Sequence, residues 1–169
     1  MSTRIFKNIL VGALALVGLL AGEAFAQATS ATVAVSAVVP KACRFYSSPA
    51  AMVIQHSGGL IDPTSGANAT GSSTLSYRCT NTVSPQFDID ASSTFESPKT
   101  ATVNLVGAVT AANLPADITV TATGGAGTGL GGSENKTATI SGLITPASFG
   151  GAAPDSYSKT VTIDIQAIP

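Results

Sequence analysis

The chain has 169 residues, with 8 basic and 9 acidic side chains, no Trp and a formal net charge of −1 at pH 7. This length suits one domain with a sizeable core, and the charge provides no basic surface for nucleic acid. The abundance of Ala, Thr, Ser, Gly and Val favours β-structure over long helices, and no clustered acidic residues suggest a metal site.

Residues 1–26 have the pattern of a signal peptide. Arg4 and Lys7 precede an apolar run at 9–20, and residues 24–26 read Ala-Phe-Ala, a small-x-small cleavage site. The alternative, a membrane anchor, needs roughly 20 apolar residues, and this run is shorter. We therefore expect an exported chain that starts at residue 27, contains no membrane span, and has 8 − 2 = 6 basic and 9 − 1 = 8 acidic side chains.

Residues 31–39 alternate in the manner of a β-strand, and they precede the first cysteine. Thr32, Ala34 and Ser36 point to one face of an extended chain, and apolar side chains point to the other. The apolar face consists of Ala31, Val33, Val35, Ala37 and Val39. An apolar strand at this position needs a sheet to join, either in its own domain or in another copy.

The two cysteines, Cys43 and Cys79, both lie in the exported part and are expected to form one disulfide. A metal or redox pair is the weaker alternative, because the spacing is not C-x-x-C and His56 is the only histidine. The sequence predicts no metal ligands and no cofactor.

Short alternating runs separated by turn residues fill the rest of the chain. The predicted strands are 41–45, 74–79, 87–91, 102–109, 117–122, 137–144 and 157–167. Turn signals cover 57–68, after a short apolar run at 51–54, and a Gly-rich loop covers 124–132. That loop lacks the Gly-Lys-Ser/Thr ending of a phosphate-binding loop.

Two features bear on an enzymatic role, and neither favours one. Asp88 and Asp90 lie two apart on a predicted strand, and we expect both on its solvated face, opposite Phe87 and Ile89. No Ser/His/Asp grouping is recognisable around the single histidine. We therefore predict that the protein is not an enzyme.

The last predicted strand, 157–167, is the most regular. Its apolar positions are Val161, Ile163, Ile165 and Ala167, and polar residues alternate with them. About seven short strands without helical periodicity predict an all-β protein with a β-sandwich fold. As the final strand of the sequence, 157–167 is expected to leave an open edge, and open edges promote aggregation.

These residues resemble the spore coat protein U domain family, which is similar to subunits of archaic chaperone/usher pili. The likeness rests on short motifs over nearly all of the exported chain. They are the strand before Cys43, Asp62-Pro63 with Gly66, Ala69 and Gly71, the Cys79-Thr80 pair, the Gly-rich region, and the ending Tyr157-x-x-Thr-Val-Thr-Ile. The sequence departs from the family at 81–83, where a Gly is expected, and at 153–156, where a Gly usually precedes the final Tyr.

The resemblance implies an immunoglobulin-like, Greek-key β-sandwich that lacks its last strand. In such pili a periplasmic chaperone supplies a strand until an outer-membrane usher exchanges it for the N-terminal strand of another subunit. The implied organisation is a donor strand at 27–40 and a pilin-like domain at 41–169. The donor residues would be Val33, Val35, Ala37 and Val39, and the acceptor groove would be formed by Val161, Ile163, Ile165 and Ala167.

The sequence therefore supports two hypotheses. In the first, the protein is exported through the periplasm to the cell surface and polymerises with copies of itself or related subunits, supporting adhesion or biofilm formation. In the second, it is an exported coat or binding module with a complete sandwich, and residues 31–39 pair within their own domain.

Overall fold

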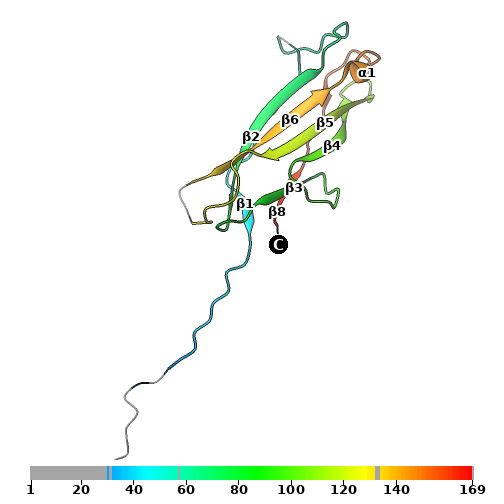
Figure 1. Ribbon diagram of the computed structural model, residues 1–169. Helices are drawn as coiled ribbons and strands as arrows, with labels where there is room; N and C mark the ends of the chain where they lie inside the picture. Colours follow the sequence, from blue (N-terminus) through cyan, green and yellow to red (C-terminus); the bar gives the residue numbers. More distant parts are fainter. Residues whose placement is uncertain (1–29, 31, 57, 132–133, 169) are drawn as a thin grey trace, which may run out of the picture. The chain divides into compact units, whose positions relative to one another are not determined.

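A computed structural model describes residues 30, 32–56, 58–131 and 134–168 (Figure 1). The predicted signal peptide lies outside the described residues. The chain divides into two units, Met1–Ala37 and Val38–Pro169. All strands and the one helix assigned within the described ranges belong to the second unit.

The larger sheet is antiparallel and has six strands in the order β1-β2-β6-β5-β4-β7. Their bounds are β1 (Cys43–Phe45), β2 (Ala69–Cys79), β4 (Lys99–Gly107), β5 (Asn113–Ala122), β6 (Lys136–Ile144) and β7 (Tyr157–Ser158). A second sheet pairs β3 (Pro85–Ile89) with β8 (Ile163–Ala167). The only helix in the described residues is the short α1 (Pro146–Phe149).

The two sheets enclose the core, as the alternating sequence requires. In β5, for example, Ala116, Ile118 and Val120 are buried, and the residues between them are partly exposed. The sheets meet where the rings of Tyr77 on β2 and Phe87 on β3 pack edge to face, with centroids 6.1 Å apart. The expectation of an all-β, sandwich-like protein is confirmed, with antiparallel sheets curled into a half-barrel (Figure 1).

Strand register defines two ends of the sandwich. β2 and β6 pair from Ala69 and Ile144 at one end to Tyr77 and Lys136 at the other. The helix end contains α1, the β4–β5 turn and the loop residues 58–68. The disulfide end contains β1, the last residues of β8 and the loop residues 80–84, 123–131 and 134–135 (Figure 1).

The Cys43–Cys79 disulfide is confirmed, and it joins residues directly opposite each other on β1 and β2. It closes the disulfide end immediately after the N-terminal segment.

Several strand predictions need correction. β5 begins at Asn113, four residues before the expected start, and β4 covers Lys99–Gly107 where 102–109 was expected. β3 ends at Ile89, two residues early, because Asp90 and Ala91 have φ values of 52° and 54°, which a strand cannot accommodate. The predicted strand 157–167 is interrupted: β7 pairs with β4, β8 pairs with β3, and residues 159–162 belong to neither sheet. β2 begins at Ala69, five residues before the expected start.

Candidate functional site

The candidate site is an apolar groove on the sandwich, between residues 49–54 and residues 157–163. Two adjoining cavities of about 570 Å³ and about 470 Å³ form it, and both are lined by Val53, Ile54 and Leu105. Such volumes are in the range of ligand-binding clefts.

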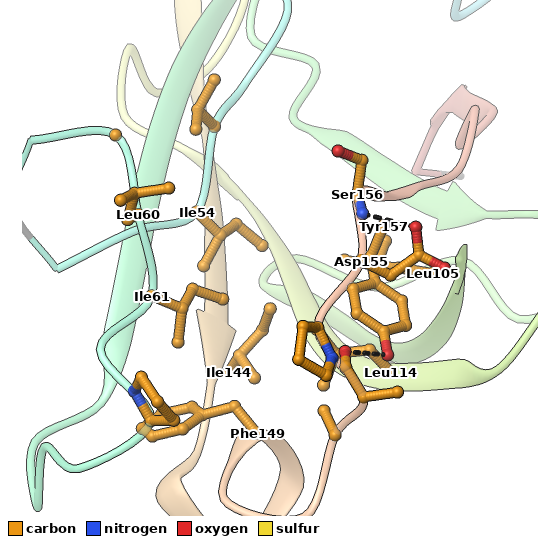
Figure 2. A pocket seen from close by; sticks show the side chains of 16 residues that line it. Ile54, Leu60, Ile61, Leu105, Leu114, Ile144, Phe149, Asp155, Ser156 and Tyr157 are labelled. Carbon is orange, nitrogen blue, oxygen red and sulfur yellow. Dashed lines mark hydrogen bonds between the residues drawn. The ribbon is translucent and has the colours of Figure 1, made fainter. Parts of the chain in front are cut away.

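Core residues of the large sheet form the floor of the groove. Leu105 comes from β4, Ile118 from β5 and Ile140 from β6. Towards the helix end, Leu114, Ile144 and Phe149 continue this surface. Figure 2 shows Ile54, Leu60 and Ile61 on one side of the space, facing Tyr157 and Leu105 on the other. The groove therefore exposes part of the core.

Residues 49–54 form the first wall, and two glycines position it. Gly71 on β2 and Gly142 on β6 are directly opposite each other in the sheet. A Cβ on Gly71 would lie 2.3 Å from the Val53 carbonyl oxygen, and one on Gly142 would lie 2.6 Å from Ile54 Cδ1. Only glycine allows this wall to pack so closely on the sheet.

Residues 157–163 form the second wall. Tyr157 and Ser158 are held by β4, and the Tyr157 hydroxyl donates a hydrogen bond to the Ala153 carbonyl oxygen at 2.8 Å. Thr162 is held by Asp90: its amide donates to the Asp90 carboxylate, and its carbonyl accepts from the Asp90 amide, both at 2.8 Å. The wall is thus fixed at both ends.

Both walls contain backbone groups that are free to form hydrogen bonds. In the second wall these groups lie between its two anchors. No backbone–backbone hydrogen bond joins residues 49–54 or 159–161 to any other residue that the structure describes. β8 likewise pairs only with β3. Unpaired extended backbone beside an apolar surface is the arrangement that accepts an added strand.

The predicted groove residues divide into two pairs. Val161 and Ile163 line the groove. Ile165 and Ala167 lie opposite Phe87 and Pro85 of β3, pack against the core, and line neither cavity. The groove is therefore centred nearer the helix end than the sequence pattern suggested.

Sequence reasoning missed the opposite wall and the floor. Residues 51–54 were recognisable only as a short apolar run, too short to indicate a wall. The one available signal was a pair of glycines inside otherwise regular strands, because such glycines often mark close backbone approach.

The predicted donor residues are exposed and outside any β-ladder. Of the predicted donor residues, Val33, Val35 and Val39 retain at least 80% of their accessible surface, and Ala37 is also exposed. The structure assigns no strand to residues 32–42, and Ala31 lies outside the described residues. Within the second unit, Val38 and Val39 thus present unpaired apolar side chains to solvent.

Asp155 organises the loops at the helix end of the groove. Its carboxylate accepts hydrogen bonds from the Val109 amide at 3.0 Å and from the Thr110 amide and hydroxyl at 2.7 Å each. These bonds, led by that from the Thr110 amide, lower the pKa of Asp155 from 3.8 to about 2. A charged Asp155 fixes the β4–β5 turn against the residues that precede β7.

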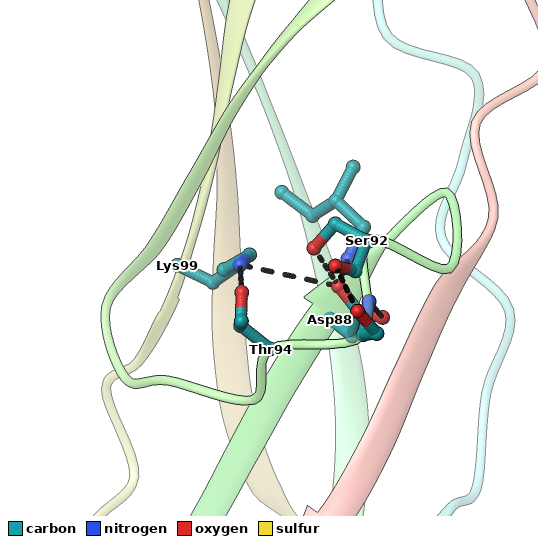
Figure 3. A network of polar contacts seen from close by, with 6 residues as sticks. Asp88, Ser92, Thr94 and Lys99 are labelled. Atoms are coloured by element: carbon teal, nitrogen blue, oxygen red, sulfur yellow. Dashed lines mark hydrogen bonds and ion pairs between the residues drawn. The ribbon is translucent and has the colours of Figure 1, made fainter.

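Asp88 is not on a solvated face, contrary to expectation. It is 2% exposed, and its carboxylate lies 4.0 Å from the ammonium of Lys99, which is also buried (Figure 3). The Ser92 hydroxyl donates to Asp88, and this bond is the main cause of its lowered pKa. The loop after β3 folds over the carboxylate, which strand periodicity alone could not predict. This pair is enclosed and away from the groove.

Asp90 is partly exposed, which agrees in part with the expectation that it lies on the solvated face of the strand. It forms an ion pair with Lys159 at 2.6 Å, and the bond from Lys159 lowers its pKa. The two aspartates thus have separate cationic partners.

Comparison with known proteins found no match, so the function has to be inferred from the geometry of the site. No family model, no curated protein and no solved structure matches this chain. In the part of the chain that the structure describes, no three His, Cys, Asp or Glu side chains are grouped to hold a metal ion. Within the same residues, no helix has the length and hydropathy required to cross a bilayer.

Proposed function

We propose that the protein is a secreted structural subunit that polymerises by donor-strand exchange, in the manner of archaic chaperone/usher pilins. The groove accepts residues 31–39 of another copy as an additional strand. The immunoglobulin-like sandwich is then completed between subunits, and the fibre supports adhesion or biofilm formation at the cell surface.

One observation carries the proposal: an apolar groove is flanked on both sides, at residues 49–54 and 159–161, by backbone that makes no backbone–backbone hydrogen bond with any described residue. Within these segments a side chain reaches the backbone at Ala50, whose carbonyl oxygen accepts a hydrogen bond from the Ser73 hydroxyl at 2.9 Å. A groove for a small molecule has no need of unpaired main chain along its length. An inserted strand would pair with both walls and cover the floor with alternate side chains, which is β-augmentation.

The dimensions of the donor fit the groove. Residues 33–39 in extended conformation span about 20 Å. The wall at 157–163 has the same number of residues. Val33, Val35, Ala37 and Val39 would face the floor, and each buried Val would contribute on the order of 1.5 to 2 kcal/mol.

Because donor and groove are different surfaces of one chain, the contact is head to tail and propagates into a fibre. A subunit with an open groove exposes core residues before assembly. A periplasmic chaperone that covers the groove and an outer-membrane usher that exchanges the strand are the partners this role requires. It requires no nucleic acid, cofactor or catalysis.

The test is a comparison of Val35→Asp with Ser36→Asp in the full chain, expressed in cells that export it and assemble it into fibres. The first change places a charge in the apolar groove, and the second places the same charge on the opposite face of the donor strand. Electron microscopy of sheared surface material should show normal fibres for wild type and Ser36→Asp, and none for Val35→Asp. Normal fibres from Val35→Asp would refute the proposal.

The second candidate, a coat or binding module that never polymerises, requires residues 31–39 to close their own domain. The exposure of Val38 and Val39 argues against it. It predicts a stable monomer whose stability falls when the N-terminal segment is removed.

A further inference from the structure

We propose that successive copies also dock through their ends, the disulfide end of one on the helix end of the next, by complementary charge. This inference rests on the proposed head-to-tail assembly and adds a second contact to the donor strand. The position of the donor segment supports this second contact, because only residues 40–42 separate Val39 from β1. Three residues span at most about 14 Å, so donor insertion brings the two ends together.

The disulfide end is basic. Lys41, Arg44, Arg78 and Lys136 lie there with one acidic residue, Glu134, which gives a formal charge of 4 − 1 = +3. Lys136 pairs with Glu134 at 3.5 Å. No carboxylate among the described residues is within ion-pair distance of Arg44 or Arg78.

The two arginines are held together on one surface. They lie directly opposite each other on β1 and β2, an arrangement in which like charges repel. Both guanidinium groups stack on Tyr46, at 4.0 Å for Arg78 and 4.8 Å for Arg44. Arg44 and Tyr46 also donate to the Leu130 carbonyl oxygen, at 3.3 Å and 3.0 Å. The result is a preorganised cationic surface around a partly exposed aromatic ring.

The helix end is acidic. Its loops at 55–70, 107–113 and 145–156 contain Asp62 and Asp155 and no Lys or Arg. His56 there is held by the Asp62 amide and the Ala67 carbonyl oxygen. With histidine counted as neutral, the formal charge of this end at pH 7 is −2. Leu60 and Val109, 75% and 89% exposed, add apolar surface beside the two carboxylates.

The two ends are about 35 Å apart along the 11 residues of β2, well beyond a Debye length. Salt therefore screens the charges of one end from those of the other, and each end interacts electrostatically with the copy that docks on it. If the donor strand runs antiparallel to residues 157–163, Val39 leaves the groove beside Tyr157, and the basic end of the donor copy meets an acidic end. In the opposite direction, two basic ends would meet and repel. The charge distribution thus also selects the direction of the donor strand.

The experiment follows polymerisation of the purified full-length exported chain by light scattering, at about 20 mM and about 500 mM NaCl, which differ severalfold in Debye length. Arg44→Glu and Asp62→Lys each reverse a charge at one end. We expect each to slow assembly about tenfold or more at low salt, and much less at high salt. The double variant leaves 3 − 2 = +1 at the disulfide end and −2 + 2 = 0 at the helix end, so at low salt it should assemble no faster than Asp62→Lys alone. Thr74→Lys, an added charge at an exposed position midway along β2 between the two ends, is the control and should assemble like wild type.

The outcomes separate this inference from the proposed function. If Val35→Asp blocks fibres but Arg44→Glu and Asp62→Lys assemble at the wild-type rate at both salt concentrations, end-to-end docking is refuted and strand exchange stands. A double variant that assembles at the wild-type rate at low salt, although its helix end has no net charge, also refutes docking by opposite charge. If wild type forms no fibres, the proposed function fails, and this inference fails with it.

Discussion

At the scale of single residues, two aspartate side chains have different structural roles because their surroundings differ. Asp88 is enclosed with Lys99, and Asp155 caps backbone amides at the surface. In sequence both are aspartates in polar segments. Only the second is close to the groove, where it fixes the loops that define the helix end.

The Asp155 hydrogen bonds predict a specific acid sensitivity. A pKa lowered to about 2 means that this carboxylate stabilises the fold above about pH 4, and that the contribution is lost as the pH falls from about 4 towards 2. Asp155→Asn should therefore melt at a lower temperature than wild type at pH 6, and the difference should shrink towards pH 2. Thermal unfolding followed by circular dichroism across this range measures it.

Asp164→Asn is the matched control, because the Asp164 carboxylate is exposed on β8 and accepts no hydrogen bond from any described residue. Its melting temperature should follow that of wild type at each pH. A difference between Asp155→Asn and wild type that stays constant from pH 6 to pH 2 would contradict the assigned role.

At the scale of elements, the groove depends on how closely residues 49–54 approach β2. This segment forms no strand. It packs on two glycines and is anchored near its ends by the hydrogen bond from the Ser73 hydroxyl to the Ala50 carbonyl oxygen and by the bridge between Gln55 and Thr70. The other wall is likewise an interruption between β7 and β8. The groove exists because two extended segments are anchored at their ends and left unpaired between.

Gly71→Ala should displace the first wall. The new Cβ would overlap the Val53 carbonyl, which belongs to the backbone and cannot rotate away. We expect a loss of about 1 to 3 kcal/mol in the free energy of unfolding, the usual cost of overpacking. Binding of a synthetic peptide with the sequence of residues 30–40 should weaken in parallel, as measured by calorimetry.

Gly66→Ala provides the comparison, because a Cβ there meets nothing within 4 Å and its φ is not positive. It should leave both stability and peptide binding close to wild type. Equal effects of the two substitutions would mean that the close approach at Gly71 does not position the wall.

At the scale of the whole molecule, the proposed function requires that the groove accept one more strand and that residues 31–39 be the segment that fills it. A copy that receives the segment in cis should be more stable and should not polymerise. Grafting residues 31–39 after Pro169 through a flexible linker, in place of the N-terminal segment, produces such a molecule. This topology lets the graft run antiparallel to residues 157–163.

We expect the grafted protein to remain monomeric in sedimentation and to exceed the same graft carrying Val35→Asp by at least about 2 kcal/mol in free energy of unfolding. The difference combines the lost burial of one Val with the cost of placing a carboxylate in the groove. Chemical denaturation measures it. Equal stability of the two grafts would show that the segment does not occupy the groove.

The sequence by itself determined the all-β class, most strand positions and the disulfide. These follow from local information: side-chain alternation fixes which face of a strand is buried, and two cysteines in a chain with a predicted signal peptide have one simple pairing. Val161 and Ile163, two of the four residues predicted to form an acceptor groove, line the cavity between the walls.

Only the tertiary structure decided where the groove lies and what surrounds it. Residues 49–54 have no repeating pattern of their own, and they become a wall because Gly71 and Gly142, 71 residues apart in sequence, are opposite each other in the sheet. The burial of Asp88 and the separation of basic and acidic ends are non-local in the same way. They depend on strand pairing across the chain, and side-chain periodicity within one strand carries no information about its neighbours.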